Sequence, residues 1–182
     1  NIFLKWNLNV LQGKILTILP ATTLKIFREA TLRINGRLIS AGAAGQIITF
    51  RKYGKNDKWC GIYFMSKSSG ILDYCVIMDV NTFGGGAVTI NNSSPQVSNC
   101  IIENNTGYCS GISIIQNSVS NIFCNVIRNN SAHGIYIYNS SPCLMKNNIS
   151  GSFTKGIAAI YNDYHSSPVL GKTSPLSSGN NL

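Results

Sequence analysis

The side chains that could carry acid–base or metal chemistry are few and scattered. The chain of 182 residues has six carboxylates, two histidines and six cysteines, and no two cysteines have the CxxC spacing of a zinc site. General acid–base catalysis needs two titratable groups brought to one place. The acids are Glu29, Asp57, Asp73, Asp79, Glu103 and Asp163, and the histidines are His133 and His165. This scatter favours a binding or structural role over catalysis, without a metal ion or cofactor.

Positive charge is concentrated in the first third of the chain. Eleven of the 15 Lys and Arg residues lie in residues 1–67 with only Glu29 and Asp57 as acids, which gives +9 (11 minus 2); the remainder is neutral. We expect a basic surface made by Lys25, Arg33, Arg37, Arg51, Lys52, Lys55 and Lys58. Such a surface would meet an anionic polymer, namely an acidic polysaccharide, teichoic acid or lipid headgroups. Charge alone also admits nucleic acid, but no nucleic-acid-binding motif supports that partner. The alternative is a solvated face that keeps the chain soluble and blocks edge pairing.

Aromatic and hydroxyl side chains recur at regular intervals. Tyr63, Thr89, Ser113, Tyr136 and Ala158 follow one another at spacings of 22 to 26 residues, with Tyr138, Tyr161 and Tyr164 nearby. If these positions faced outward in one row, the stacking faces and hydroxyl groups would suit a glycan chain. The alternative is the ordinary preference of Tyr and Thr for exposed strands. Either interpretation requires an element that repeats with this period.

The period belongs to the whole middle of the chain. Residues 92–105 (NSSPQVSNCIIENN) are echoed by residues 117–130 (NSVSNIFCNVIRNN), and a Gly- or Ala-initiated apolar strand begins at Gly61, Ala87, Gly111, Gly134 and Gly156. Each unit is too short for a crossover helix, and its apolar residues alternate between Asn, Gly, Ser and Pro turns. A repeat of this length predicts an array in which each unit buries its apolar face against its neighbours. Like residues then stack on like about 4.8 Å apart.

Several segments carry a family resemblance. They are residues 16–20 (LTILP), 32–38 (LRINGRL), 47–50 (IITF) and 59–62 (WCGI), together with the repeated Ser-Ser-Pro, Asn-Cys-x-Ile and Asn-Asn elements. In these the chain resembles the right-handed parallel β-helix family, the pectate-lyase-like superfamily, and especially the repeat domains of secreted bacterial and archaeal surface proteins. The resemblance implies an all-β, single-stranded right-handed parallel β-helix of about seven coils.

The resemblance also implies where enzymes of this fold would work. Polysaccharide lyases need a carboxylate cluster that holds Ca²⁺ and a base, and glycoside hydrolases need two or three carboxylates on neighbouring coils. By register Asp73, Asp79 and Glu103 fall at different points round the coil, and Glu103 stacks on Arg128 as a surface ion pair. We therefore expect a non-catalytic structural or carbohydrate-binding module, secreted or on the cell surface. A lyase or hydrolase fragment is the first alternative, and a self-associating surface-layer or adhesin segment is the second.

Cysteine and asparagine positions are expected to be structural. Cys75 and Cys100 occupy the same place in successive units, which suits a stack of buried thiols and would also allow a disulfide. The pairs Asn104/Asn129 and Asn105/Asn130 each share a register, and Asn99, Asn125 and Asn147 fall near a second bend. Asn tolerates the left-handed backbone of a sharp bend, and its amide can bond the Asn of the next coil.

One domain spans residues 1–182. We expect residues 1–12 to cap or open the first coil and residues 174–182 to be a tail or an incomplete last coil, so the chain is expected to be a piece of a longer protein. No apolar run is long enough for a transmembrane helix. The insertions at residues 51–58, 79–86 and 107–110 are the places where a solenoid carries binding residues. Trp59 is assigned first to the core and second to a sugar platform.

Overall fold

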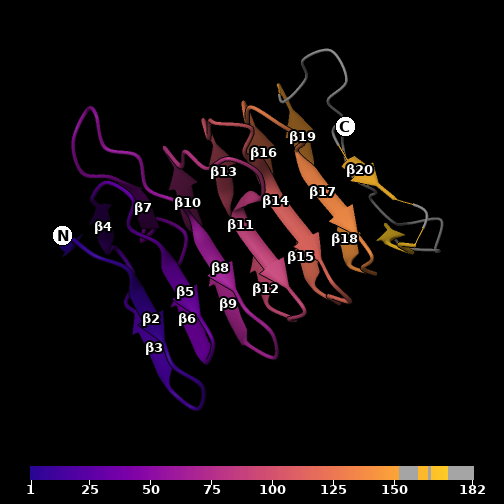
Figure 1. Ribbon diagram of the computed structural model, residues 1–182, viewed down its shortest axis with the longest axis horizontal. Coiled ribbons are helices and arrows are strands. Elements are labelled where there is room, and N and C mark those ends of the chain that lie inside the picture. Colours follow the sequence, from indigo (N-terminus) through magenta and orange to yellow (C-terminus); the bar gives the residue numbers. More distant parts are fainter. Residues whose placement is uncertain (152–159, 164, 172–182) are drawn as a thin grey trace.

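The chain winds through three parallel β-sheets. The computed structural model describes residues 1–151, 160–163 and 165–171. Each strand pairs with the strand three places later in the sequence, so every coil contributes one strand to each sheet (Figure 1). Each sheet has seven strands, and the chain therefore makes about six full turns from the first strand of a sheet to its last. The predicted right-handed parallel β-helix is confirmed, with about six turns in place of about seven coils.

The strands are short and evenly distributed. Sheet 1 contains β1 (Ile2–Leu4), β4 (Thr23–Ile26), β7 (Ile48–Lys52), β10 (Cys75–Met78), β13 (Ile101–Glu103), β16 (Val126–Arg128) and β19 (Asn148–Ser150). Sheet 2 contains β2 (Leu8–Val10), β5 (Leu32–Ile34), β8 (Ile62–Phe64), β11 (Gly86–Asn91), β14 (Ser110–Ile115), β17 (Ile135–Tyr138) and β20 (Ile160–Asn162). Sheet 3 contains β3 (Ile15–Ile18), β6 (Arg37–Ala41), β9 (Ser69–Asp73), β12 (Gln96–Ser98), β15 (Asn121–Phe123), β18 (Cys143–Met145) and β21 (Val169–Leu170).

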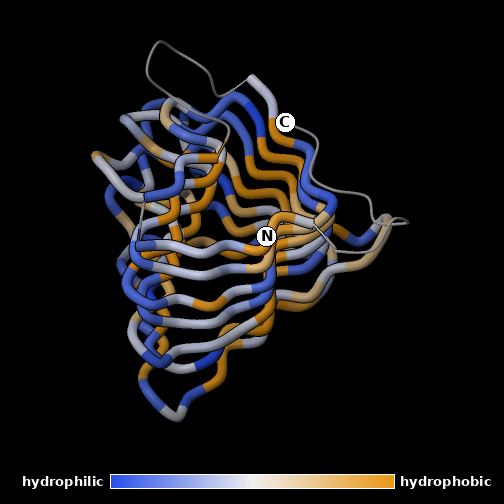
Figure 2. Tube along the Cα trace, turned by 90° about the vertical axis from the view of Figure 1, so that its right-hand side faces the viewer, coloured by the Kyte–Doolittle hydropathy of each residue, from blue (hydrophilic) through white to orange (hydrophobic). Residues whose placement is uncertain are grey.

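The core is a set of apolar columns that run along the solenoid axis. In sheet 1, Ile77 pairs with Ile102 and Ile102 with Ile127, and in sheet 3 Val97 pairs with Ile122. These side chains are fully buried, and Figure 2 shows hydrophobic segments of successive turns side by side. Full burial of one such side chain stabilises the fold by roughly 1.5–3 kcal/mol. The predicted stacking of like residues is confirmed.

Polar ladders line the inside of the corners. Between sheets 2 and 3 a buried serine column runs through Ser68, Ser93, Ser118, Ser140 and Ser166, and the hydroxyl groups of Ser118, Ser140 and Ser166 each accept from the backbone N–H of the serine one coil earlier, at 3.1–3.3 Å. Between sheets 1 and 2, the Asn105 amide donates to Asn130 Oδ1 at 2.8 Å. These ladders satisfy backbone groups that a sharp bend leaves without strand partners.

The third corner, between sheets 3 and 1, changes from cysteine to asparagine along the stack. Cys75 and Cys100 are buried free thiols, and the next two coils place Asn125 and Asn147 there, joined by a 2.9 Å amide hydrogen bond. Cys75 Sγ lies 3.3 Å from Ser40 Oγ. Burial raises the pKa of the Cys100 thiol well above its ordinary value. This agrees with the interpretation of the column as buried thiols.

The structure describes the N-terminal end of the chain, and the predictions for the C-terminal end lie largely outside the described residues. Residues 2–4 and 8–10 form β1 and β2, which pair with β4 and β5, so this segment opens the first coil. The expected strand at residues 156–158 and the tail at 174–182 lie outside the described residues. Trp59 is fully buried and its indole N–H donates to the Met78 carbonyl at 2.9 Å, which confirms the core assignment. No helix long and apolar enough to span a bilayer occurs in the part of the chain that the structure describes.

Candidate ligand-binding cleft

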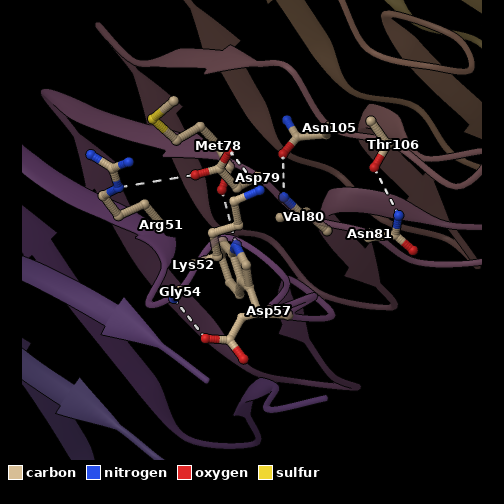
Figure 3. Close-up of polar contacts among 11 residues, drawn as sticks. Arg51, Lys52, Gly54, Asp57, Met78, Asp79, Val80, Asn81, Asn105 and Thr106 are labelled. Carbon is tan, nitrogen blue, oxygen red and sulfur yellow. Dashed lines mark hydrogen bonds and ion pairs between the residues drawn. The ribbon is translucent and has the colours of Figure 1, made fainter. Parts of the chain in front are cut away.

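The insertion between β7 and β8 builds a cleft on the corner between sheets 1 and 2. The cleft has a volume of about 310 Å³ and reaches across three coils (Figure 3). One wall is the loop after β7, and the other is the backbone that follows β10 and β13. The lining residues are Lys52, Lys55, Asn56, Asp57, Lys58, Asp79, Asn81, Asn104 and Thr106. Its surface therefore offers ammonium, amide, hydroxyl and carboxylate groups.

The lysine-bearing loop is held at both ends. Asp57 Oδ2 accepts a 2.6 Å hydrogen bond from the Gly54 N–H, and the Asp57 N–H donates back to the Gly54 carbonyl at 3.2 Å. Tyr53 stacks on Phe27, with ring centroids 4.2 Å apart and planes 11° from parallel. The Lys58 carbonyl accepts a 2.7 Å bond from the Glu29 N–H. Because the backbone of the loop is fixed in this way, the lysine ammonium groups can move only as far as their own side chains allow.

The opposite wall is a hydrogen-bonded pair of turns. The Asn81 amide donates to Thr106 Oγ1 at 2.8 Å, and the two residues form a parallel bridge. Beneath them the Val80 N–H donates to the buried Asn105 Oδ1 at 2.9 Å. The polar side chains of this wall therefore stand on the asparagine ladder of the corner.

Asp79 supplies negative charge at the base of the cleft. Its φ of 63° places it in the left-handed region at the bend after β10. Arg51 Nε and Lys52 Nζ each lie 4.0 Å from one of its carboxylate oxygens, beyond hydrogen-bond length. Its Oδ2 atom is buried and has no hydrogen-bond partner. The contact with the two cations is therefore Coulombic, and Asp79 offsets part of their charge without immobilising them.

The residues of the predicted basic surface lie at three separate places in the structure. Lys52, Lys55 and Lys58 line the cleft with two carboxylates, a net charge of +1 (3 minus 2), and Arg51 lies beside it, 4.0 Å from Asp79 Oδ2. Arg33 instead lies on sheet 2, in a groove of about 400 Å³ with Tyr63 and Thr89. Arg37 lies on sheet 3, in a depression of about 250 Å³ with Lys14 and Lys67. The residues of the predicted basic surface therefore lie on three different sheets, because alternation along each strand sends their side chains outward.

The predicted glycan row on sheet 2 is interrupted. Tyr63, Thr89, Ser113 and Tyr136 do share one register, but the next member is Tyr161 rather than Ala158, which lies outside the described residues. Thr89 and Ser113 are only 5% and 2% exposed. The Thr89 hydroxyl bonds the Gly86 backbone instead of facing solvent. The expectation of an open row of hydroxyl groups is therefore corrected.

Towards the end of that sheet the aromatic side chains fall into two groups, a stacked cluster around Tyr136 and the single exposed ring of Tyr138. Tyr136 stacks on Tyr161 with ring centroids 5.2 Å apart and planes 5° from parallel, and His133 lies 5.0 Å from Tyr161. Burial, together with Tyr161, Asp163 and Tyr138, raises the pKa of Tyr136. Tyr138 is exposed at the end of β17. Because Tyr136 and Tyr161 cover one face of each other, this cluster offers less stacking surface than a row of separate rings.

The acids are placed as expected except for one pair. Glu103 accepts from Arg128 at 2.7 Å, as the register predicted, and Asp73 accepts from Ser98 and Asn99 at 2.8 Å each. The loop, however, brings Asp57 into the same cleft as Asp79. Sequence reasoning also missed Asn81, Asn104 and Thr106, although the 25-residue interval from Asn81 to Thr106 places them one coil apart. No group of three His, Cys, Asp or Glu that could hold a metal ion is found among the described residues.

A parallel solenoid whose loops build a polar cleft on one corner defines the class of the protein. Residues 30–150, more than half of the chain, match the family model described as right handed beta helix region. The chain therefore belongs to the right-handed β-helix family. Neither the curated proteins nor the solved structures gave a match to this chain.

Proposed function

We propose that this chain is a non-catalytic carbohydrate-binding module that holds an acidic polysaccharide in the cleft between the β7–β8 loop and the turns after β10 and β13. The observation that carries the proposal is the grouping of Lys52, Lys55 and Lys58 opposite amide and hydroxyl side chains in one hollow. A uronate unit presents a carboxylate beside several hydroxyl groups. Its carboxylate matches the lysines and its hydroxyl groups match the opposite wall. Polymers of this kind occur in cell walls and matrices, so the proposed location is secreted or on the cell surface.

The charges of the cleft support binding rather than bond cleavage. Asp57 caps its own loop through the Gly54 N–H, and Asp79 is flanked by Arg51 and Lys52. The Asp57 carboxylate is therefore held by its own loop, and the Asp79 carboxylate lies in the field of two cations. Lysine ammonium groups are flexible point charges, which suits a polymer whose charge matters more than the exact angle of each carboxylate. Affinity of this origin falls as salt screens it, since the Debye length is about 10 Å at 0.1 M ionic strength.

Binding of polygalacturonate, measured by calorimetry at low and high salt, tests the proposal. We expect Lys55→Gln and Lys58→Gln each to weaken binding by roughly two- to five-fold, the effect of about 0.5–1 kcal/mol for one exposed charge pair. Lys146→Gln is the matched control, because Lys146 is an exposed lysine that does not line the cleft. Binding that persists unchanged in high salt, or that ignores both cleft substitutions, would contradict the proposal.

Polysaccharide cleavage is the second candidate, and the observation that favours it is the presence of Asp57 and Asp79 in one cleft. A glycoside hydrolase uses two carboxylates that flank the scissile bond. An assay for new reducing ends and for unsaturated products on the same polymer separates the two functions. A binding module gives neither product, whereas an enzyme gives one of them and loses it in Asp79→Asn.

A further inference from the structure

Two aromatic side chains, each two residues after a residue of the cleft, are largely exposed to solvent. Phe83 is 90% exposed and Tyr108 is 68% exposed. Their ring centroids are 5.5 Å apart and their planes are tilted by 55°. They come from the insertions at residues 79–86 and 107–110, one coil apart. Single exposed apolar side chains are common, but two exposed rings in contact form a small contiguous apolar patch of the kind that can meet a ligand.

Hydrogen bonds and close packing join the two loops that carry the rings. The Thr82 N–H donates to the Thr106 carbonyl at 3.3 Å, and the Ser110 N–H donates to the Gly85 carbonyl at 3.0 Å. A methyl group on Gly107 would lie 2.9 Å from the Thr82 carbonyl oxygen, and the φ of +81° at Gly107 favours glycine. The Tyr63 hydroxyl lies 3.3 Å from Thr82 Oγ1. Close packing and hydrogen bonds therefore join the loops below the rings.

The aromatic pair adjoins the cleft through both loops. Asn81 and Thr106 line the cleft, and Phe83 and Tyr108 follow each of them by two residues. Two residues of extended chain span at most about 7 Å, so each ring lies within reach of the unit next to one bound in the cleft. The rings are flanked in sequence by Thr82, Gly84 and Gly107, and not by further exposed apolar side chains. The apolar patch is thus small and surrounded by polar groups.

We propose that Phe83 and Tyr108 form a stacking platform for a pyranose ring, adjacent to the acidic unit held by the lysines. The inference rests on the proposed function and deepens it: the ligand is an oligosaccharide of at least two units, acidic at the cleft and presenting the C–H face of a ring to the platform. Aromatic faces attract apolar C–H surfaces, and the flanking amide and hydroxyl groups accommodate the ring hydroxyls. A patch of two rings matches one sugar better than a protein interface, which requires a much larger contact.

Binding of galacturonic acid and of tetragalacturonate, compared by calorimetry, tests the platform. Phe83→Ala and Tyr108→Ala are each expected to weaken tetragalacturonate binding roughly 3- to 10-fold, the range that a single aromatic contact contributes. Binding of the monosaccharide should not change, because it occupies the cleft alone. Tyr108→Phe keeps the ring and should retain binding. Trp6→Ala is the matched control, since Trp6 is 80% exposed on the first coil and does not line the cleft.

The outcomes separate this inference from the proposed function. Tetragalacturonate binding that needs Lys55 but ignores both aromatic substitutions overturns the platform and leaves the acidic cleft. Binding that needs the aromatic pair but ignores Lys55→Gln supports the platform and overturns the acidic cleft. Absence of binding to both probes overturns both proposals. If Phe83→Ala abolishes self-association in sedimentation without affecting sugar binding, the pair is a contact between copies and the platform is wrong. The melting temperature should not shift, because neither ring is packed in the core.

Discussion

Replacement of Asn105 by Ala tests the idea that corner ladders hold the coils together. Asn105 is fully buried at the corner beneath the cleft. Its Oδ1 atom accepts from the Val80 N–H at 2.9 Å, and its amide group donates to Asn130 Oδ1 at 2.8 Å. The substitution removes these two hydrogen bonds and a longer one, 3.5 Å, from the amide group to the Ile77 carbonyl, and it leaves the buried Val80 N–H without this acceptor. The Asn side chain thus bonds to the coil before it and to the coil after it.

The expected loss of stability follows from the buried groups that lose a partner. Leaving one buried donor unsatisfied costs about 1–3 kcal/mol, and loss of the second hydrogen bond adds about 0.5–1.5 kcal/mol. We therefore expect Asn105→Ala to lower the free energy of unfolding by about 3 kcal/mol. With a denaturant slope of roughly 2 kcal/mol/M, the urea midpoint should fall by about 1.5 M.

Equilibrium urea unfolding monitored by circular dichroism measures this loss, and two further variants define its origin. Asn105→Leu fills the space but also lacks the polar groups, so it should be nearly as destabilised if hydrogen bonding, not volume, is responsible. Asn148→Ala is the control for an exposed asparagine on a strand. If Asn105→Ala unfolds within about 0.5 kcal/mol of the wild type, as a surface change would, the corner ladder does not stabilise the coil.

Three further predictions concern the core. Burial raises the pKa of the Cys109 thiol to about 12 from 9.0, so between these pH values the folded state keeps a proton that the unfolded chain releases. The free energy of unfolding is therefore unaffected by this thiol below pH 9 and falls as the pH rises towards 12. Cys109→Val should flatten that alkaline decline in urea titrations. Gly111→Ala places a methyl group 2.5 Å from Ile127 Cγ2 and 2.6 Å from the Gly134 carbonyl oxygen and should destabilise the protein by about 1–3 kcal/mol in thermal unfolding. Acrylamide should quench Trp6 but not Trp59, so Trp6→Phe should leave one unquenched emission, and quenching of that emission would contradict the burial of Trp59.

The fold could be predicted because each coil repeats the same inward residues. The 25-residue repeat predicts that Val97 pairs with Leu72 in the coil before it and with Ile122 in the coil after it, and the structure has both pairs. The Asn positions follow the same logic: Asn99, Asn104 and Asn129 have φ between 51° and 56°, while Asn105, Asn125, Asn130 and Asn147 are buried. Sequence periodicity therefore predicts the strand stack, whereas the left-handed backbone at Asn99 also recurs at Tyr74, Cys124 and Lys146, where the residue type does not repeat.

The candidate site could be predicted only in part because it lies where the repeat is interrupted. The lysines of residues 52–58 were recognised as a basic insertion, but nothing in the period says over which corner that insertion folds. Its position opposite Asp79 and Asn81 goes with the packing of Tyr53 against Phe27, which is a tertiary contact. Burial of Thr89 likewise depends on its hydroxyl turning back to the Gly86 backbone, a contact that strand alternation does not indicate.

The inward and outward polar groups of the same corner have different tasks. Asn105, pointing inward, has its acceptor and amide donors used by neighbouring coils, so it is unavailable to a ligand. Asn104, one residue earlier, has a left-handed φ of 56° at the bend, and its exposed side chain lines the cleft. A pair of adjacent asparagines thus supplies one group for stability and one for the surface. Lys55 and Lys58 of the cleft come from the insertion after β7. The cleft therefore depends on the insertion after β7, and its deletion should abolish acidic-polymer binding while leaving the stacked coils intact.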